Sequence, residues 1–329
     1  MKRLLIGLSI AAIASFGAIS AQAETTIRVT LQISEKHSLG QNWIAFKKIV
    51  EEKSGGDLKV QLFPSAQLYK DKQVPEAVGS GAIEAGSAFL GRFAGSVPAV
   101  EVINVPFLFD TEAKLRKATA TGSKIRNILD AAVLKETGAK VLWWQAFGRN
   151  IYLSKKDPLR LPSDLKGKKV RTYGKILGWT VQALGGAPTL MSGSKQFLAY
   201  QQGAVDVGMT GVSTIETRKL YEVMKHATLS YDSAIEFVAV INNKFFNSLS
   251  EKNQKIILDA AIKVEKQLRD EVYADEDRLV NVVRPKINLI ELTAAERAEW
   301  RKATLSVGDK FATERGAVAA AVIKIARGM

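Results

Sequence analysis

Hydrophobic and polar positions change period repeatedly along this chain. In the segment 25–33, TTIRVTLQI, side chains such as Ile27, Val29 and Leu31 share one face at a spacing of two, which is typical of a half-buried strand. Residues 39–53 carry apolar side chains at helical spacing and end at the turn sequence SGG. The same patterns predict further strands in DLKVQLFP, IEAGSAFLG, AKVLWWQAFG, KKVRTYG, AVDVGMTG and FVAVINNKFF, most of them separated by helices. Strands that alternate with single helices favour an α/β fold of two domains with largely parallel sheets.

One segment is far longer than the other predicted helices. Ser248 or Ser250 can cap a helix that Pro285 must stop, and an apolar stripe runs along the residues between them. About 34 residues at 1.5 Å each give a helix of roughly 50 Å. This length exceeds the diameter of either small domain, so we expect the helix to run across both.

The first 23 residues are typical of a secretory signal peptide. MKR is a short positive region, LLIGLSIAAIASFGAIS is apolar, and AQA offers small residues for cleavage after Ala23. A membrane anchor is the alternative, but the apolar run is short and ends in a cleavage motif. We therefore expect an exported protein that works in the periplasm.

Composition excludes some kinds of chemistry and bears on the kind of partner. The 329 residues include no cysteine, which rules out disulfides and thiolate chemistry. The formal net charge is +14, which is one signature of nucleic-acid binding. Here, however, the basic residues are spread along the chain and interleaved with acids, as in EAKLRK. We expect a solvated basic surface and no nucleic-acid partner.

The motifs of common enzymes are missing. The chain has two histidines, His37 and His226, and no zinc-binding spacing, G-x-S-x-G elbow or phosphate-binding loop. GSGAIEAG has Glu84 where a dinucleotide-binding turn needs its third glycine. Two carboxylates that meet in the fold remain the open alternative. We expect no enzymatic activity, no metal and no cofactor.

Arg171 is the residue that most needs an explanation. It lies in the predicted strand KKVRTYG, where Val170 and Tyr173 suit a partly buried sheet. A buried guanidinium at the end of a strand is costly unless an anion meets it. The position therefore indicates either an internal ion pair or an anionic ligand.

Four stretches together resemble one family. FPSAQLYKDKQVPEAVGSGAIEAG, VPAVEVINVPFLF, FGRNIYLSKKDPLRLPSDLKGKKVRTYGK and FLAYQQGAVDVGM follow the order found in the extracytoplasmic solute-binding subunits of TRAP transporters, of the DctP type. The resemblance implies two hinged α/β lobes of the periplasmic binding protein fold, with a long helix along both and a ligand in the cleft. It also implies a membrane permease as partner and uptake driven by an ion gradient.

The resemblance assigns roles to particular residues. It implies that Arg171 binds a ligand carboxylate, and that Arg149, in FGRN, binds another ligand oxygen. An ion pair between strands or at the hinge is the alternative for Arg149. Where relatives commonly read VDGQENP this chain reads VDVGMTG, so Thr210 stands at the place of an asparagine and replaces part of its hydrogen bonding.

The expected lobes divide the chain at two crossings. We expect lobe I to contain 24–147 and about 235–278, and lobe II to contain 148–234 and about 279–329. Ligands of open α/β sheets bind at loops after strands. Further candidates for the cleft on this basis are His37, Phe89, Arg92, Tyr173, Trp179 and Phe237. Core packing is the alternative for each aromatic.

Several ligand classes stay open at this point. The aromatic residues favour an aromatic or aliphatic monocarboxylate, including 2-oxo acids, whereas two arginines allow a C4-dicarboxylate. A receptor that feeds a sensor kinase is the alternative to one that feeds a permease. We expect the protein to be a monomer.

Overall fold

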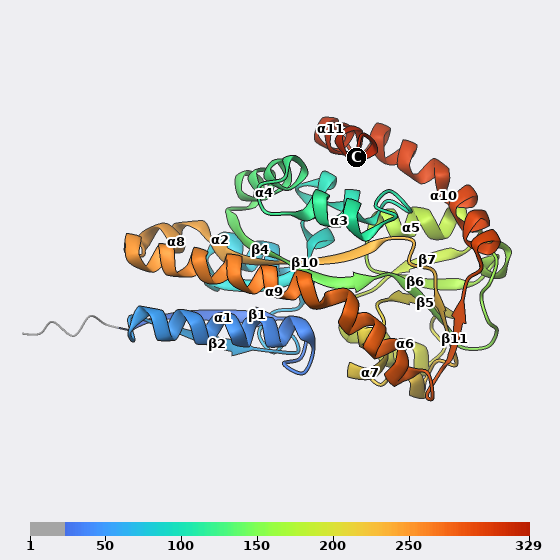
Figure 1. The fold of residues 1–329 in the computed structure, drawn as a ribbon, viewed down its shortest axis with the longest axis horizontal. Coiled ribbons are helices and arrows are strands. Elements are labelled where there is room, and N and C mark those ends of the chain that lie inside the picture. Colours follow the sequence, from blue (N-terminus) through green and yellow to red (C-terminus); the bar gives the residue numbers. More distant parts are fainter. Residues whose placement is uncertain (1–23) are drawn as a thin grey trace, which may run out of the picture.

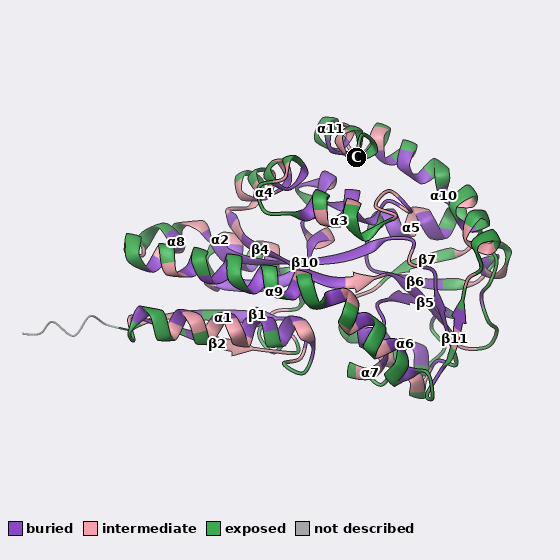
Figure 2. Ribbon diagram, viewed as in Figure 1, coloured by how far each residue is buried: buried purple, intermediate pink, exposed green. Residues whose placement is uncertain are grey.

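Two β-sheets organise residues 24–329, which are the residues that the computed structural model describes (Figure 1). The predicted signal peptide and its cleavage after Ala23 lie outside this range. Buried residues concentrate on the strands and on the inward sides of the helices (Figure 2). The α/β architecture with two lobes that the alternating pattern predicted is therefore confirmed.

The first sheet has five strands in the order β2-β1-β3-β10-β4. These are β1 (Thr25–Leu31), β2 (Leu58–Phe63), β3 (Ala85–Phe89), β4 (Ala139–Arg149) and β10 (Ala234–Asn242). β1 pairs in parallel with β2 and β3, but β10 runs antiparallel to β3 and β4. The sheet is mixed rather than largely parallel because β10 enters it from the second lobe, in the direction opposite to β4, which leaves it.

The second sheet has six strands in the order β11-β9-β5-β8-β6-β7. These are β5 (Ile151–Ser154), β6 (Lys169–Thr172), β7 (Ala187–Leu190), β8 (Val207–Thr210), β9 (His226–Leu229) and β11 (Asn288–Glu291). β6 pairs in parallel with β7 and β8, whereas β5 is antiparallel to β8 and β9. This sheet is mixed for the same reason, since β5 is the continuation of the chain that leaves the first lobe.

Helices cover both sheets. The first lobe carries α1 (Ser38–Ser54), α2 (Val74–Ser80), the 3₁₀ helix η3 (Pro98–Asn104), α3 (Glu112–Thr119), α4 (Lys124–Thr137) and α8 (Asn243–Ser248). The second carries α5 (Lys175–Ala183), α6 (Gln196–Gln201) and α7 (Ser213–Thr217). The pattern FVAVINNKFF is only partly strand, because the side chain of Asn242 accepts a hydrogen bond from the backbone N–H of Phe245 and so begins α8.

The long helix is α9 (Glu251–Val283), and it packs on α1 and β4 of the first lobe and on α7 of the second (Figure 1). The Ser250 hydroxyl caps it by accepting from the backbone N–H of Asn253 at 3.2 Å. Pro285 follows two residues after its end. The sequence prediction of one helix that contacts both lobes is confirmed.

Two segments connect the sheets side by side. β4 continues into β5 through Asn150, and β9 returns to β10 through residues 230–233. The backbone N–H of Asn150 donates to the carbonyl of Ser233 at 2.8 Å, and Tyr231 N–H donates to the Asn150 carbonyl at 3.0 Å. These bonds hold the two crossing segments together between the lobes.

The C-terminal helices return to the first lobe. α10 (Ala294–Glu314) packs on α5, and α11 (Ala317–Arg327) packs on η3 and α4. In α11, Val322 and Ile323 are buried in the same apolar cluster as Leu129 of α4. The structure thus differs from the expected assignment of 279–329 to the second lobe, because the apolar stripe of α11 is buried against the first.

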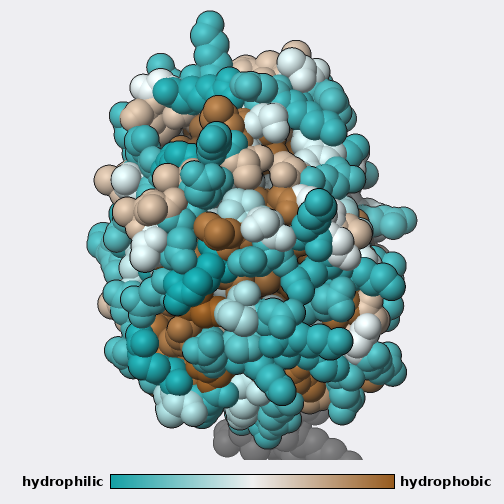
Figure 3. All heavy atoms as spheres, turned by 90° about the vertical axis from the view of Figure 1, so that its right-hand side faces the viewer, coloured by the Kyte–Doolittle hydropathy of each residue, from teal (hydrophilic) through white to brown (hydrophobic). Residues whose placement is uncertain are grey.

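The surface at one end of the molecule is mainly polar. The end of the molecule formed by the second lobe shows hydrophilic side chains with small apolar areas between them (Figure 3). Among residues 24–329, no helix combines the length and the apolar character needed to cross a membrane.

Candidate functional site

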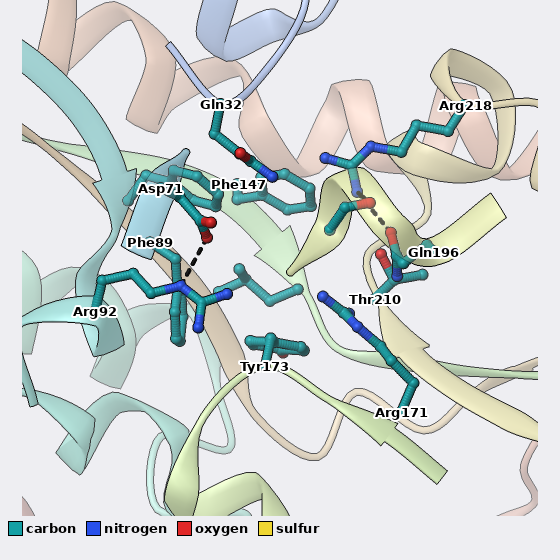
Figure 4. A pocket seen from close by; sticks show the side chains of 13 residues that line it. Gln32, Asp71, Phe89, Arg92, Phe147, Arg171, Tyr173, Gln196, Thr210 and Arg218 are labelled. Carbon is teal, nitrogen blue, oxygen red and sulfur yellow. Dashed lines mark hydrogen bonds and ion pairs between the residues drawn. The ribbon is translucent and has the colours of Figure 1, made fainter. Parts of the chain in front are cut away.

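A small cavity lies between the lobes, and both lobes contribute to its wall (Figure 4). Its volume is about 40 Å³, which is space for roughly three water molecules. The residues that line it are Gln32, Asp71, Phe89, Arg92, Phe147, Arg171, Tyr173, Gly193, Gln196, Thr210, Arg218, Ile235 and Phe237. A site of this size suits a compact solute.

Arg171 projects into this cavity from β6 and is 3% exposed. Its Nε and Nη2 donate to the carbonyl of Met191 at 3.1 and 2.8 Å, and its Nη1 donates to the carbonyl of Met209 at 2.5 Å. These bonds use three of the five N–H donors of a guanidinium. No carboxylate of residues 24–329 pairs with Arg171, and burial lowers its pKa. The remaining donors, one on each terminal nitrogen, are free for an anion.

Arg218 approaches the same space from the end of α7. Its Nη1 donates to the carbonyl of Gly193 at 2.9 Å and to Oε1 of Gln196 at 2.5 Å. Burial, and then the nearby charge of Arg171, lowers the pKa of Arg218 to about 10. The site therefore contains a second cation that stays charged at neutral pH.

Arg92 differs from these two arginines because it has a counter-charge. Its Nε donates to Oδ2 of Asp71 at 2.7 Å. The Ser192 hydroxyl donates to Oδ1 of Asp71 at 2.8 Å and accepts from Nε2 of Gln32 at 3.3 Å. Ser192 follows β7 of the second lobe, so these bonds connect the two lobes beside the cavity.

Aromatic rings form the apolar wall. Phe147 stacks on Phe237 with ring centroids 5.4 Å apart, and Phe89 meets Tyr173 edge-on at 5.0 Å. The Tyr173 ring also lies 5.2 Å from the Arg171 guanidinium, and its hydroxyl donates to Oδ1 of Asn150 at 3.0 Å. Tyr173 thus packs against the Arg171 guanidinium and is hydrogen-bonded to the crossing segment through Asn150.

Thr210 lies at the end of β8 with its hydroxyl 2.7 Å from that of Thr214. The Thr214 hydroxyl donates to the carbonyl of Gly211, so its own proton is used. The Thr210 hydroxyl must then donate to Thr214, which leaves it only as an acceptor toward the cavity. It cannot supply the donor that an asparagine amide would supply.

The structure brings six of the nine residues singled out from the sequence to this cavity. They are Arg171, Thr210, Phe89, Arg92, Tyr173 and Phe237. His37 lies behind the wall, with its ring 4.8 Å from that of Phe147 and its Nε2 2.8 Å from the hydroxyl of Ser213. Burial lowers the pKa of His37 to about 3, so the imidazole is neutral and supports the wall.

Arg149 and Trp179 lie elsewhere. Arg149 donates from Nε to Glu276 of α9 at 2.6 Å, and its guanidinium lies 3.7 Å from the centre of the Tyr231 ring. Trp179 lies on α5 and faces α10, where Nζ of Lys310 lies 4.5 Å from the centre of its ring. Arg149 therefore forms an ion pair between a crossing strand and the long helix, which is the alternative that the sequence left open.

Sequence reasoning missed several residues of the site. These are Gln32, Asp71, Phe147, Gly193, Gln196, Arg218 and Ile235. Arg218 follows a strand and a short helix, so the rule that loops after strands carry ligands could have included it. Asp71 and Gln196 give no such signal, because nothing in the sequence around them distinguishes these buried residues from polar residues at the surface.

No group of side chains within the described range has the make-up of a metal site. A small cavity between two lobes, with two buried cations and an aromatic wall, is the arrangement of a two-lobed solute-binding protein. The sequence matches the family model "Bacterial extracellular solute-binding protein, family 7", known as DctP, over residues 30–314. The chain belongs to this family, whose members bind solutes and are not enzymes.

Named relatives agree with this assignment. The chain is 28% identical to the C4-dicarboxylate-binding periplasmic protein DctP of Rhodobacter capsulatus, over 99% of both chains. It is 30% identical to a solute-binding protein of Verminephrobacter eiseniae, over 94% of this chain and 91% of the relative.

Solved structures show the same fold. A TRAP periplasmic solute-binding protein from Sulfurospirillum deleyianum with bound succinate is 26% identical, with a TM-score of 0.85 over 93% of this chain and 99% of that one. One from Desulfovibrio salexigens with bound orotic acid is also 26% identical, with a TM-score of 0.85 over 92% and 97%.

Proposed function

We propose that this protein is a periplasmic receptor that captures a small organic acid between its lobes and delivers it to a TRAP-type permease. The observation that carries the proposal is the buried guanidinium of Arg171, which faces the cavity without a carboxylate partner among residues 24–329. Its two remaining N–H donors suit the two oxygens of a carboxylate. Export by the predicted signal peptide and uptake driven by an ion gradient belong to the same proposal.

Similar proteins support an acid as the ligand. Succinate and orotic acid, bound in the two solved relatives, both carry a carboxylate. The aromatic wall of Phe89, Phe147 and Phe237 would pack against the carbon body of the ligand, as expected for an aliphatic or aromatic monocarboxylate or a 2-oxo acid. Arg218, which also has no carboxylate partner among residues 24–329, instead favours a C4-dicarboxylate.

A ligand shifts the equilibrium between open and closed lobes only if it binds the closed state more tightly than the open one. In the structure the lobes already contact each other through Asp71 and Ser192. A ligand carboxylate on Arg171 would add an ion pair within this contact region. Binding and closure are therefore expected to be coupled.

A thermal-shift screen of the refolded chain from Glu24 onward tests the proposal. Refolding removes any acid carried through purification, and the panel holds C4-dicarboxylates, 2-oxo acids, aromatic acids, sugar acids and amino acids. A ligand at 100 times its dissociation constant adds about 2.7 kcal/mol to the free energy of unfolding. A rise in Tm with one class of acid supports the receptor, and no rise with any acid contradicts it.

A further inference from the structure

The side chain of Gln32 leaves one polar atom without a partner. Gln32 follows directly after β1, is 6% exposed and lines the cavity, and its amide points into this space (Figure 4). Its Oε1 is buried and accepts no hydrogen bond from residues 24–329. A buried acceptor that stays unpaired costs free energy. Because this one lies in the wall of a binding cavity, it indicates that the ligand supplies the missing donor.

The neighbouring hydrogen bonds determine which way the Gln32 amide faces. The Ser192 hydroxyl has one proton, and it donates this proton to Oδ1 of Asp71 at 2.8 Å. Toward Gln32 the Ser192 oxygen can therefore only accept, and it accepts from Nε2 at 3.3 Å. The amide nitrogen is held at Ser192, so Oε1 is the atom left for the ligand. Ser192 belongs to the second lobe and Gln32 to the first, so this orientation depends on the contact between the lobes.

A second acceptor lines the same cavity. The Thr210 hydroxyl donates to Thr214 and can only accept toward the cavity. Arg171 and Arg218 supply donors for the anionic part of a ligand. Gln32 and Thr210 supply acceptors instead. The cavity therefore suits an acid that also carries a hydrogen-bond donor.

The chemistry of the cavity favours a hydroxyl as this donor. An ammonium group can donate too, but the charges of Arg171 and Arg218 repel a third cation in the same buried space. The carbonyl oxygen of an oxo acid can only accept, so it would face the oxygen of Gln32 without a proton between them. A hydroxyl is neutral and has the proton that Oε1 lacks.

We propose that Gln32 selects hydroxy acids, because its Oε1 accepts a hydrogen bond from a hydroxyl of the ligand. Ser192 is the positioning residue that turns this oxygen toward the ligand. The inference rests on the proposed function. It concerns the choice between hydroxy, oxo and unsubstituted acids, whatever the number of carboxylates on the ligand.

Calorimetric titration with three matched series of acids tests the assignment. The series are butyrate, 2-hydroxybutyrate and 2-oxobutyrate; succinate, malate and oxaloacetate; and phenylacetate, mandelate and phenylglyoxylate. Each series is titrated into the wild-type chain, Gln32→Met and Gln61→Met. The Met variant of Gln32 keeps the length of the side chain and removes the acceptor. Gln61 is the matched control, because it is an exposed glutamine of the neighbouring strand β2.

We expect the wild type to bind the hydroxy acid of at least one series about tenfold or more tightly than both other members. Gln32→Met should bring the three members of that series to similar affinities, and Gln61→Met should keep the preference. A hydroxyl preference that survives in Gln32→Met would overturn the assignment. Binding of acids without any hydroxyl preference would overturn it and leave the receptor function standing, whereas no binding of any acid would overturn both.

Ser192→Ala tests the positioning role separately. Without the Ser192 oxygen the Gln32 amide can rotate and present its NH₂ group, which suits an oxo acid. We expect weaker binding of every acid and a smaller ratio between hydroxy and oxo acids. Ser163→Ala, at an exposed serine of the second lobe, should change neither. Equal weakening of all acids with an unchanged ratio would show that Ser192 only joins the lobes and would overturn its positioning role.

Discussion

The carboxylate of Glu101 in the first lobe accepts a hydrogen bond from the backbone N–H of Lys175, the first residue of helix α5 in the second lobe, at 2.6 Å. α5 is preceded by Gly174, which has no side chain to cap the helix. The other oxygen of Glu101 accepts from Nη2 of Arg315 at 2.8 Å. One buried carboxylate therefore caps a helix of the opposite lobe, directly after the strand that carries Arg171.

Glu101→Ala should weaken the binding of every acid by a similar factor. The contact spans the two lobes, so its loss removes a bond of the closed state that does not touch the ligand. A lost helix cap costs about 0.5–2 kcal/mol, which is roughly 2- to 30-fold in affinity. Titration calorimetry measures this, with the exposed Glu314→Ala as control, and an unchanged affinity would show that closure does not depend on Glu101.

Arg171→Ala should reduce the affinity for the native acid by about 2–4 kcal/mol, because a charge-assisted pair in a buried site disappears. Arg171→Lys should recover little, since an ammonium lacks the planar fork that meets both carboxylate oxygens. Lys169→Ala, an exposed residue of the same strand, is the control. Wild-type affinity in Arg171→Ala would refute the assigned carboxylate site.

Arg149→Met should lower the free energy of unfolding and leave the choice of ligand unchanged. Glu276 is only 5% exposed in its side chain, and removal of Arg149 leaves this carboxylate without its cation. We expect a loss of about 2–4 kcal/mol in urea unfolding, and a partial recovery in the double variant Arg149→Met/Glu276→Gln. A loss of ligand affinity without a loss of stability would instead support the role in ligand binding that the family resemblance implied.

His37 should make stability depend on pH. Its folded pKa of about 3 lies below the ordinary value of 6.5, so the unfolded chain binds a proton below pH 6.5 that the folded chain does not. Stability is thus lost as the pH falls, by about 1.4 kcal/mol per unit and about 2 kcal/mol at pH 5. His37→Asn keeps an acceptor for the Leu39 N–H and should show a smaller loss between pH 7 and pH 5.

Urea unfolding at the two pH values, with His226→Asn as control, measures this difference. His226 is the other histidine of the chain, and its Nε2 contacts a backbone carbonyl in an exposed setting. An identical decrease in wild type and His37→Asn would place the pH dependence on other groups.

The sequence predicted well wherever the physical cause is local. Period-two and helical spacings located most strands and helices, and Ser250 and Pro285 bounded the long helix because capping and the missing proline N–H act within a few residues. Arg171 could be singled out because a charged side chain is unusual in a strand whose pattern predicts burial. The strands β5, β7, β9 and β11 have four residues each, which is too short a pattern to be recognised.

Only the tertiary structure decided which side chains meet. Arg149 lies 127 residues from Glu276 along the chain, and no spacing signal connects them, so the ion pair was only one of two alternatives. Arg218 lies 47 residues from Arg171 along the chain, and only the fold places both at the same cavity. By itself the sequence determined the local elements, the class of fold and one buried cation, because these depend on neighbours along the chain. The direction of β10, the return of α11 and the charge balance of the cavity depend on contacts between distant segments.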